Sequence, residues 1–255
     1  MVECTIQQKA LVLLALIIED LNASRSSKEE IGNAVAVFTA SLDSTHRLAR
    51  LLQLLWASSG FGPANEVAEF SSQLNQKERS SLVRQCSQGE IKVVVCSDGM
   101  AHGMDIPAIV SVINYDIPGF AKTYVHCCGR TARAGRQGKA TSILQAGGRD
   151  VASFRKFRKL IHNFDQVKPR GIRKDLAKDA VHQYPKCVQK LQDVIEMEQN
   201  WKLNPIAPLG DDWFIREDEE SKASKSDSES ESGDSELEGS GSDDDDMESD
   251  VEMSE

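Results

Sequence analysis

Residues 93–107 read VVVCSDGMAHGMDIP, and this stretch decides the fold that we predict. It starts as an apolar, β-branched run, which is typical of a strand buried on both faces of a parallel sheet. A hydroxyl, a carboxylate and two glycines follow directly. Ligands bind at the carboxyl ends of parallel strands, and glycine lets a backbone approach them closely. We therefore expect a binding site where this strand ends.

Similar short apolar runs alternate with helical patterns on both sides of this stretch. Strands are expected at 34–39, 66–70, 92–96, 110–115 and 140–144. Helices are expected at 1–22, 44–56, 76–85 and 121–128, and Asp43 or Ser44 is expected to cap the second of them. This order of elements predicts an α/β fold with a mostly parallel sheet that is flanked by helices on both faces.

Two further helices are expected downstream of these elements. Residues 151–164, VASFRKFRKLIHNF, place apolar residues on one side of a helix and basic residues on the other. Two interpretations of the basic side stay open: a solvated surface, or a surface that faces RNA. After Pro185, residues 186–199 place an apolar stripe on a helix that we expect to pack on its own domain.

Charge is distributed unevenly along the 255 residues. The chain has 30 basic and 40 acidic residues, but residues 217–255 alone hold 18 acidic and 2 basic ones. The body, 1–216, is therefore mildly basic, which fits binding to a polyanion and is also common in soluble domains. The tail has no aromatic residue and too little apolar surface to offset its ordering entropy, so it is expected to be disordered.

No membrane segment, leader or metal site is expected. The apolar run 10–18 is about half the length that a membrane span needs, and acidic residues flank it instead of the features of a signal peptide. The six cysteines form no C-x-x-C pair, so we expect reduced, structural thiols and no metal. These features predict an intracellular protein.

A second stretch carries chemistry: residues 124–139, YVHCCGRTARAGRQGK. Arg130 and Arg133 are three residues apart, and if the start of this stretch is helical, that spacing places both guanidinium groups on one side. Guanidinium groups bind phosphate with fixed geometry. We expect them to face a cleft at the carboxyl edge of the sheet, where a nucleotide held by another segment would lie.

Together the two stretches resemble the carboxy-terminal RecA-like domain of the DEAD-box RNA helicases, and the resemblance spans residues 5–162. VFTAS at 37–41 is similar to motif IV, 71–83 to the Q-x-x-R element, SDGMAHGMD at 97–105 to motif V, and HCCGRTARAG at 126–135 to motif VI, H-R-x-G-R-x-G-R. Residues 71–72 and INYDIP at 113–118 are most similar to the ribosome-assembly branch of the family.

This resemblance implies a role for each matching residue. Arg130 and Arg133 would be arginine fingers that neutralise the transferring γ-phosphoryl group of ATP. Asp105 would hold the ribose of ATP, and Gly103 would let the backbone lie close to it. His126 would couple ATP to closure between two domains.

The resemblance also implies a surface for RNA that reads the phosphate backbone with little sequence preference. The residues it assigns to RNA are Arg79, Ser97, Ser41 and Gln76. Plainer roles stay open for two of them, because Gln76 is also typical of a surface and Ser41 of a helix cap.

Two positions depart from the family pattern. Cys127 replaces the arginine that follows the motif VI histidine, and His102 replaces the motif V arginine. Both substitutions are expected to remove positive charge near the nucleotide cleft. Either this branch tolerates weaker coupling to ATP, or the domain has moved toward a non-catalytic role.

The motifs of the other half of such an enzyme are missing. The chain contains no G-x-x-x-x-G-K-[ST] loop and no D-E-A-D sequence on an apolar strand. The family places both, with the Mg²⁺ site, on an amino-terminal RecA-like domain. The chain is therefore expected to act on ATP and RNA only with such a domain, in cis or in trans, and to be inactive alone.

We expect four segments: a RecA-like domain at 1–165, a helical extension at 166–200, a tether at 201–216 and the acidic tail at 217–255. An alternative function is a non-catalytic RNA and protein interaction module, whose tail binds basic ribosomal or chromatin proteins. A third reading is a fragment of a longer gene product. The nucleus or nucleolus is the expected location, with the cytoplasm as the alternative.

Overall fold

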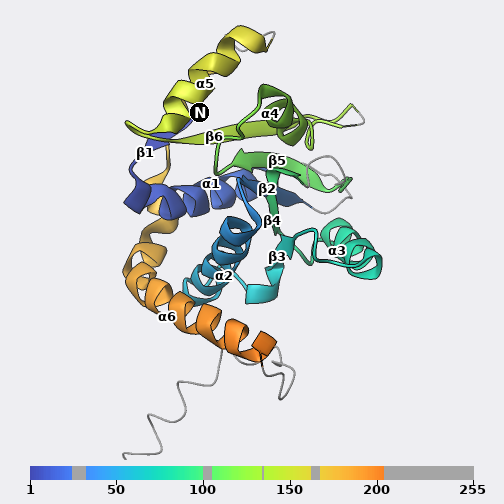
Figure 1. Ribbon diagram of the computed structural model, residues 1–255, viewed down its shortest axis with the longest axis vertical. Coiled ribbons are helices and arrows are strands. Elements are labelled where there is room, and N and C mark those ends of the chain that lie inside the picture. Colours follow the sequence, from blue (N-terminus) through green and yellow to red (C-terminus); the bar gives the residue numbers. More distant parts are fainter. Residues whose placement is uncertain (25–32, 100–104, 134, 162–166, 204–255) are drawn as a thin grey trace, which may run out of the picture. The chain divides into compact units, whose positions relative to one another are not determined.

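The apolar runs form one parallel sheet in the computed structural model, which describes residues 1–24, 33–99, 105–133, 135–161 and 167–203 (Figure 1). Its six strands are β1 (Val2–Cys4), β2 (Ala34–Thr39), β3 (Val67–Phe70), β4 (Val93–Ser97), β5 (Ile109–Asn114) and β6 (Lys139–Gln145). They lie in the order β1-β6-β5-β2-β4-β3, and every neighbouring pair is parallel. All residues of β2 and β4 are buried, as predicted for strands covered on both faces.

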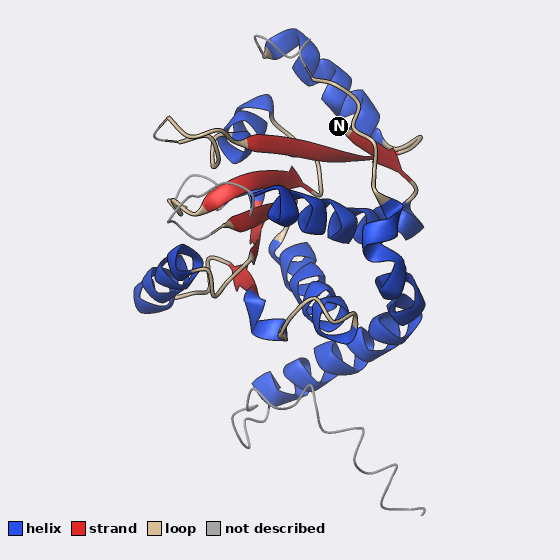
Figure 2. Cartoon of the chain, turned by 180° about the vertical axis from the view of Figure 1, so that it is seen from behind, coloured by secondary structure: helices blue, strands red, loops and turns tan. Residues whose placement is uncertain are grey.

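The helices connect these strands. They are α1 (Lys9–Ser24), α2 (Leu42–Ser58), α3 (Gln76–Gln88), α4 (Ala121–Cys128), α5 (Arg149–Leu160) and α6 (Lys178–Leu203). Short 3₁₀ turns occur at Ile6–Gln8, Ala64–Glu66 and Lys174–Ala177. The prediction of an α/β domain with helices on both sides of the sheet is confirmed (Figure 2).

Three expected boundaries are wrong. Residues 1–5 are not helical, because Val2 and Cys4 pair with β6 as the edge strand β1. Ser41, not Asp43 or Ser44, caps α2: its hydroxyl accepts from the backbone N–H of Ser44 at 3.1 Å. Helix α6 begins before Pro185 and runs through it.

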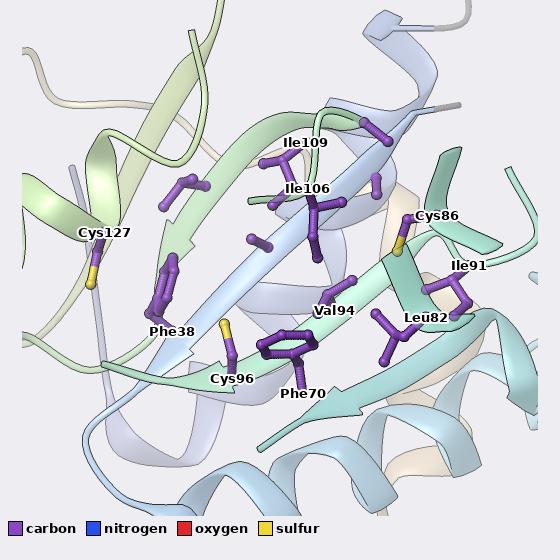
Figure 3. Close-up of a cluster of buried hydrophobic side chains, with 14 residues drawn as sticks. Phe38, Phe70, Leu82, Cys86, Ile91, Val94, Cys96, Ile106, Ile109 and Cys127 are labelled. Atoms are coloured by element: carbon purple, nitrogen blue, oxygen red, sulfur yellow. The ribbon is translucent and has the colours of Figure 1, made fainter. Parts of the chain in front are cut away.

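The core lies on both faces of the sheet. On one face, α3 and α4 cover a cluster that includes Phe38, Phe70, Val94 and Cys127 (Figure 3). Helices α1 and α2 lie against the strands on the other face, and α6 packs on the outside of α2. All six cysteines are free, as predicted, and five of them are buried.

Two ionic clusters attach the chain after α5 to the sheet domain. The buried Asp20 carboxylate accepts from Ser111 Oγ at 2.6 Å and pairs with Lys139 at 2.8 Å and Arg170 at 2.7 Å. His46 on α2 lies between Glu69, at 2.8 Å, and Glu198 of α6, at 2.6 Å. Long-range pairs of this kind fix α6 and the preceding loop on the sheet domain.

None of the described helices combines the length and apolar character that crossing a membrane requires.

Candidate functional site

The two arginines lie where α4 ends. Thr131, between them, is buried, and its hydroxyl donates to the carbonyl oxygens of Ile109 at 3.2 Å and Val110 at 2.9 Å. These carbonyls belong to the start of β5, so the arginines lie at the amino edge of the sheet. The expectation of a cleft at the carboxyl edge is wrong for them, because α4 runs back along the sheet before it presents the motif.

Backbone carbonyls of the same helix end hold both guanidinium groups. Arg130 Nε donates to the carbonyl of His126 at 3.0 Å, and Arg133 Nε donates to the carbonyl of Gly129 at 3.0 Å. Arg133 also forms an ion pair with Asp105. The structure thus brings together three predicted site residues. Arg133 lies 28 positions after Asp105 in the chain and three after Arg130.

The electrostatics of this cluster suit an anionic ligand. Burial, and then the charge of Arg133, lower the pKa of Arg130 from its ordinary value. An anion placed between two like charges relieves their repulsion. The side chains of Arg133 and Asp105 are 32% and 79% exposed, so both can change partners without unfolding of the loop.

A left-handed turn shapes the loop between the two arginines. Ala132 has φ +57°, a conformation that alanine adopts at a cost and glycine adopts freely. Gly138 lies against this turn, since a Cβ there would be 2.3 Å from Ala132 N and 2.4 Å from Thr131 Oγ1. Our sequence reasoning missed both positions, although motif VI has glycine where Ala132 stands.

Other predicted residues lie at the opposite, carboxyl edge. Ser97 is the last residue of β4 and is mostly buried, whereas the exposed Ser41 follows β2. Because β2 and β4 are neighbours in the sheet, the two serines lie at adjacent strand ends. Sequence reasoning missed the nearby Asp116, which accepts from the N–H of Ala40 at 3.1 Å and pairs with the buried Lys9 at 2.7 Å.

The Q-x-x-R pair lies on α3, which follows β3 at the same edge. Arg79 Nη2 donates to the carbonyl of Ser72 at 3.1 Å, while its Nε is buried with no hydrogen-bond partner among the described residues. Gln76 is exposed and lines an open hollow of about 480 Å³ with Lys77, Ser80, Ser81 and Arg84. The hydroxyls and cations of this hollow can bind phosphate.

Cys127 belongs to the buried hydrophobic cluster (Figure 3). Its side chain is fully buried, and burial raises its pKa to about 12. Cys127 interacts electrostatically with Arg130, and the expectation that it removes positive charge near the nucleotide cleft stays a prediction. Its neighbour His126 is half-buried in the last turn of α4, and Gly103 and His102 lie outside the described residues.

Comparison with known proteins identifies this arrangement. Residues 9–135 match the helicase conserved C-terminal domain. The E. coli DEAD-box protein SrmB, solved bound to RraA, superimposes with a TM-score of 0.52 at 27% identity, over 69% of this chain and 90% of that one. The chain contains the carboxy-terminal RecA-like domain of the DEAD-box RNA helicases. The carboxy-terminal domain of the DEAD-box protein Dbp5 gives a TM-score of 0.51 at 25% identity, over 72% of this chain and 94% of that one.

Full-length relatives of this helicase domain are much longer. DEAD-box ATP-dependent RNA helicase 1 of Arabidopsis thaliana is 34% identical over 176 residues, which is 66% of this chain and 30% of the relative. ATP-dependent RNA helicase DDX51 of Mus musculus is 32% identical over 203 residues, 79% of this chain and 28% of the relative. The chain therefore spans about three tenths of the length of these two relatives.

Proposed function

We propose that this chain is the carboxy-terminal half of an ATP-dependent RNA helicase and requires an amino-terminal RecA-like domain, in cis or in trans. The observation that carries the proposal is the cluster of Arg130, Arg133 and Asp105 on one edge of the sheet. Dbp5 of S. cerevisiae, which is 25% identical, has been solved bound to RNA and ADP BeF3. This relative supports the assignment of both ligands.

At the amino edge, the arginines would act on a nucleotide that the partner domain holds. ATP supplies the phosphoryl group and the free energy, and Mg²⁺ would be held by the partner domain. Arg130 and Arg133 would neutralise the charge that develops on the γ-phosphoryl group. Arg133 would leave Asp105 for the phosphate, which frees that carboxylate to accept from the ribose hydroxyls. His126, on the same helix end, would couple this exchange to domain closure.

At the carboxyl edge, Ser41, Ser97, Gln76 and Arg79 would bind RNA phosphates and leave the base edges unread. Gly103 would serve ATP and not RNA, by letting the backbone approach the nucleotide that the partner domain holds. Since the arginines and the RNA-facing residues lie at opposite edges of one rigid sheet, closure around ATP would move the whole RNA surface as a unit.

The remaining assignments extend this function. The chain would divide into a RecA-like domain (1–165), a helical extension (166–200), a tether (201–216) and an acidic tail (217–255), and the tail would bind basic ribosomal proteins. Relatives named as an rRNA helicase, rrp3 of Botryotinia fuckeliana, and as DDX51 support a place in ribosome assembly, in the nucleus or nucleolus. The alternative, a non-catalytic interaction module, is favoured by the 18 acidic residues of that tail.

The test is ATP turnover with and without RNA by three samples: the chain alone, an amino-terminal RecA-like domain of a DEAD-box relative alone, and the two joined in one polypeptide. We expect RNA-stimulated turnover only from the joined protein, because the chain has no phosphate-binding loop. Turnover by the chain alone, or a joined protein that binds RNA but never hydrolyses ATP, would contradict the proposal and, in the second case, favour the interaction module.

A further inference from the structure

Helix α5 presents a basic outer face that the functional site does not use. Arg155, Lys156 and Lys159 are exposed, while Phe154 and Phe157 on the opposite side are 5% and 3% exposed. At about 100° per residue, the three cations fall within one stripe that points directly away from the two phenylalanines. We call Arg155, Lys156 and Lys159 the α5 basic face.

Acidic residues do not compensate this face. Among the described residues, the three cations form no ion pair and no side-chain hydrogen bond, and the single carboxylate of α5, Asp150, accepts from the N–H of Gln145 instead. Two arginines of α2 are paired, by contrast: Arg47 bonds Asp43 at 3.0 Å, and Arg50 bonds Glu198 at 2.7 Å. The α5 basic face is thus free to bind a polyanion.

The fold places this face at the end of the edge that carries the RNA-facing residues. Strand β6 ends at Gln145, and after a turn at Gly147, φ +70°, α5 begins at Arg149. The helix therefore starts at the carboxyl edge. Strand β4 lies three strands away from β6 in the sheet, which is about 14 Å at ordinary strand spacing. One RNA molecule can therefore reach the ends of both strands.

We propose that the α5 basic face binds the phosphate backbone of RNA that extends beyond the carboxyl edge of the sheet. This inference rests on the proposed function and adds a second RNA contact to it. Three cations without aromatic or amide neighbours on the same stripe bind phosphates and do not read bases. The contact therefore adds affinity that is independent of sequence and sensitive to salt.

RNA is a better occupant of this face than the acidic tail of the same chain. The described chain ends at Leu203 on α6, which packs on α2 beside β3 and β4. Helix α5 lies beyond β6, at the other end of the sheet (Figure 1). A bound RNA would follow the edge that leads to α5, whereas Leu203, the last described residue, lies at the opposite end of the sheet.

The experiment measures binding of the full chain to a fluorescent 20-base-pair RNA duplex by anisotropy over a range of KCl concentrations. The test variant is Arg155→Gln/Lys156→Gln/Lys159→Gln. The matched control, Lys174→Gln/Lys178→Gln/Lys186→Gln, removes the same charge from exposed positions outside α5, in the 3₁₀ turn Lys174–Ala177 and on α6. Arg79→Ala reports separately on the carboxyl edge.

We expect the test variant to bind RNA about 10-fold more weakly at low salt. The slope of log affinity against log salt should become shallower by about 2, which corresponds to two to three lost phosphate contacts. The control should change neither by more than about 2-fold. If Arg79→Ala weakens binding and the test variant does not, the α5 contact is wrong and the proposed function stands. If neither variant changes binding, the RNA surface of the proposed function is also wrong.

The tail is tested in the same assay by deleting residues 217–255. If the deletion raises affinity for RNA in the native sequence but not in the test variant, the α5 basic face holds the tail, and the proposal of an RNA contact is overturned. If the deletion has the same effect in both, the tail does not occupy this face and the RNA contact is supported.

Discussion

Ala132 is the one described residue other than glycine with a positive φ, and it lies between the two site arginines. Alanine in this conformation costs about 1 kcal/mol relative to glycine, a cost that the greater freedom of glycine in the unfolded chain partly offsets. We predict that Ala132→Gly raises the free energy of unfolding by about 0.5 kcal/mol. Urea denaturation measures this change.

The control for this substitution is Ala152→Gly on the exposed side of α5. Glycine there should lower the free energy of unfolding by about 1 kcal/mol, since helical φ favours alanine. Equal losses at both positions would mean that the turn at Ala132 is not left-handed.

Cys127 allows a second test, because its side chain is fully buried among Phe38, Cys96 and Val112. Restoring the family residue with Cys127→Arg would bury an unpaired charge in this core. We predict a loss of at least about 3 kcal/mol in the free energy of unfolding, against about 1 kcal/mol for Cys127→Ala. An arginine that is tolerated, with an unchanged urea midpoint, would place position 127 at the surface.

The contact between Arg170 and the buried Asp20 fixes the loop that leads to α6. Arg170→Met leaves a carboxylate that is 3% exposed with one cation fewer, and we predict a loss of about 3 kcal/mol in the free energy of unfolding. Arg173→Met removes an exposed pair with Asp175 at 3.0 Å and should leave the free energy of unfolding almost unchanged, because water screens an exposed pair. Similar losses in the free energy of unfolding from both substitutions would show that burial does not make the contact between Arg170 and Asp20 more important than the exposed pair.

The contact of α6 with α2 depends on pH through His46. Hydrogen bonds to Glu198 and then to Glu69 raise the pKa of His46 to about 9. Because this pKa lies above the unfolded value of about 6.5, the stability that the histidine contributes is complete below pH 6.5 and is lost as the pH rises through 9.

Between pH 6 and pH 9.5, the free energy of unfolding should therefore fall by about 1 kcal/mol more in the native chain than in His46→Gln. This figure allows for the partial exposure of the ring. Urea denaturation of both proteins at both pH values gives the difference. Parallel pH profiles would mean that His46 is neutral in the folded chain.

The sequence predicted the central strands well, because β2 and β4 are apolar throughout and carry their own signal. It could not predict β1, since three residues pair with β6 only once the rest of the sheet exists. The motif residues were found by their order along the chain. Their division between two edges was not, because it depends on the direction in which α4 returns to the start of β5.

For the molecule as a whole, this division separates two tasks. Arg130, Arg133 and Asp105 lie at the amino edge, while Ser41 and Ser97 lie at the carboxyl edge of the same sheet. A parallel sheet buried on both faces is rigid, so under the proposed function a displacement of the arginines would move the proposed RNA surface without deforming it. In the function that we propose, the fold would couple a nucleotide held by another domain to RNA through one rigid body.

The most direct measurement of this account is RNA-stimulated ATP turnover by the joined protein carrying Arg130→Ala, Arg133→Ala or the control Arg47→Ala, whose guanidinium is exposed on α2. We predict that each site variant lowers kcat about 10³-fold or more. Its affinity for RNA should stay within about 2-fold of the parent, and its free energy of unfolding within about 1 kcal/mol. The control should stay fully active. Site variants that hydrolyse ATP as fast as the control would contradict the account.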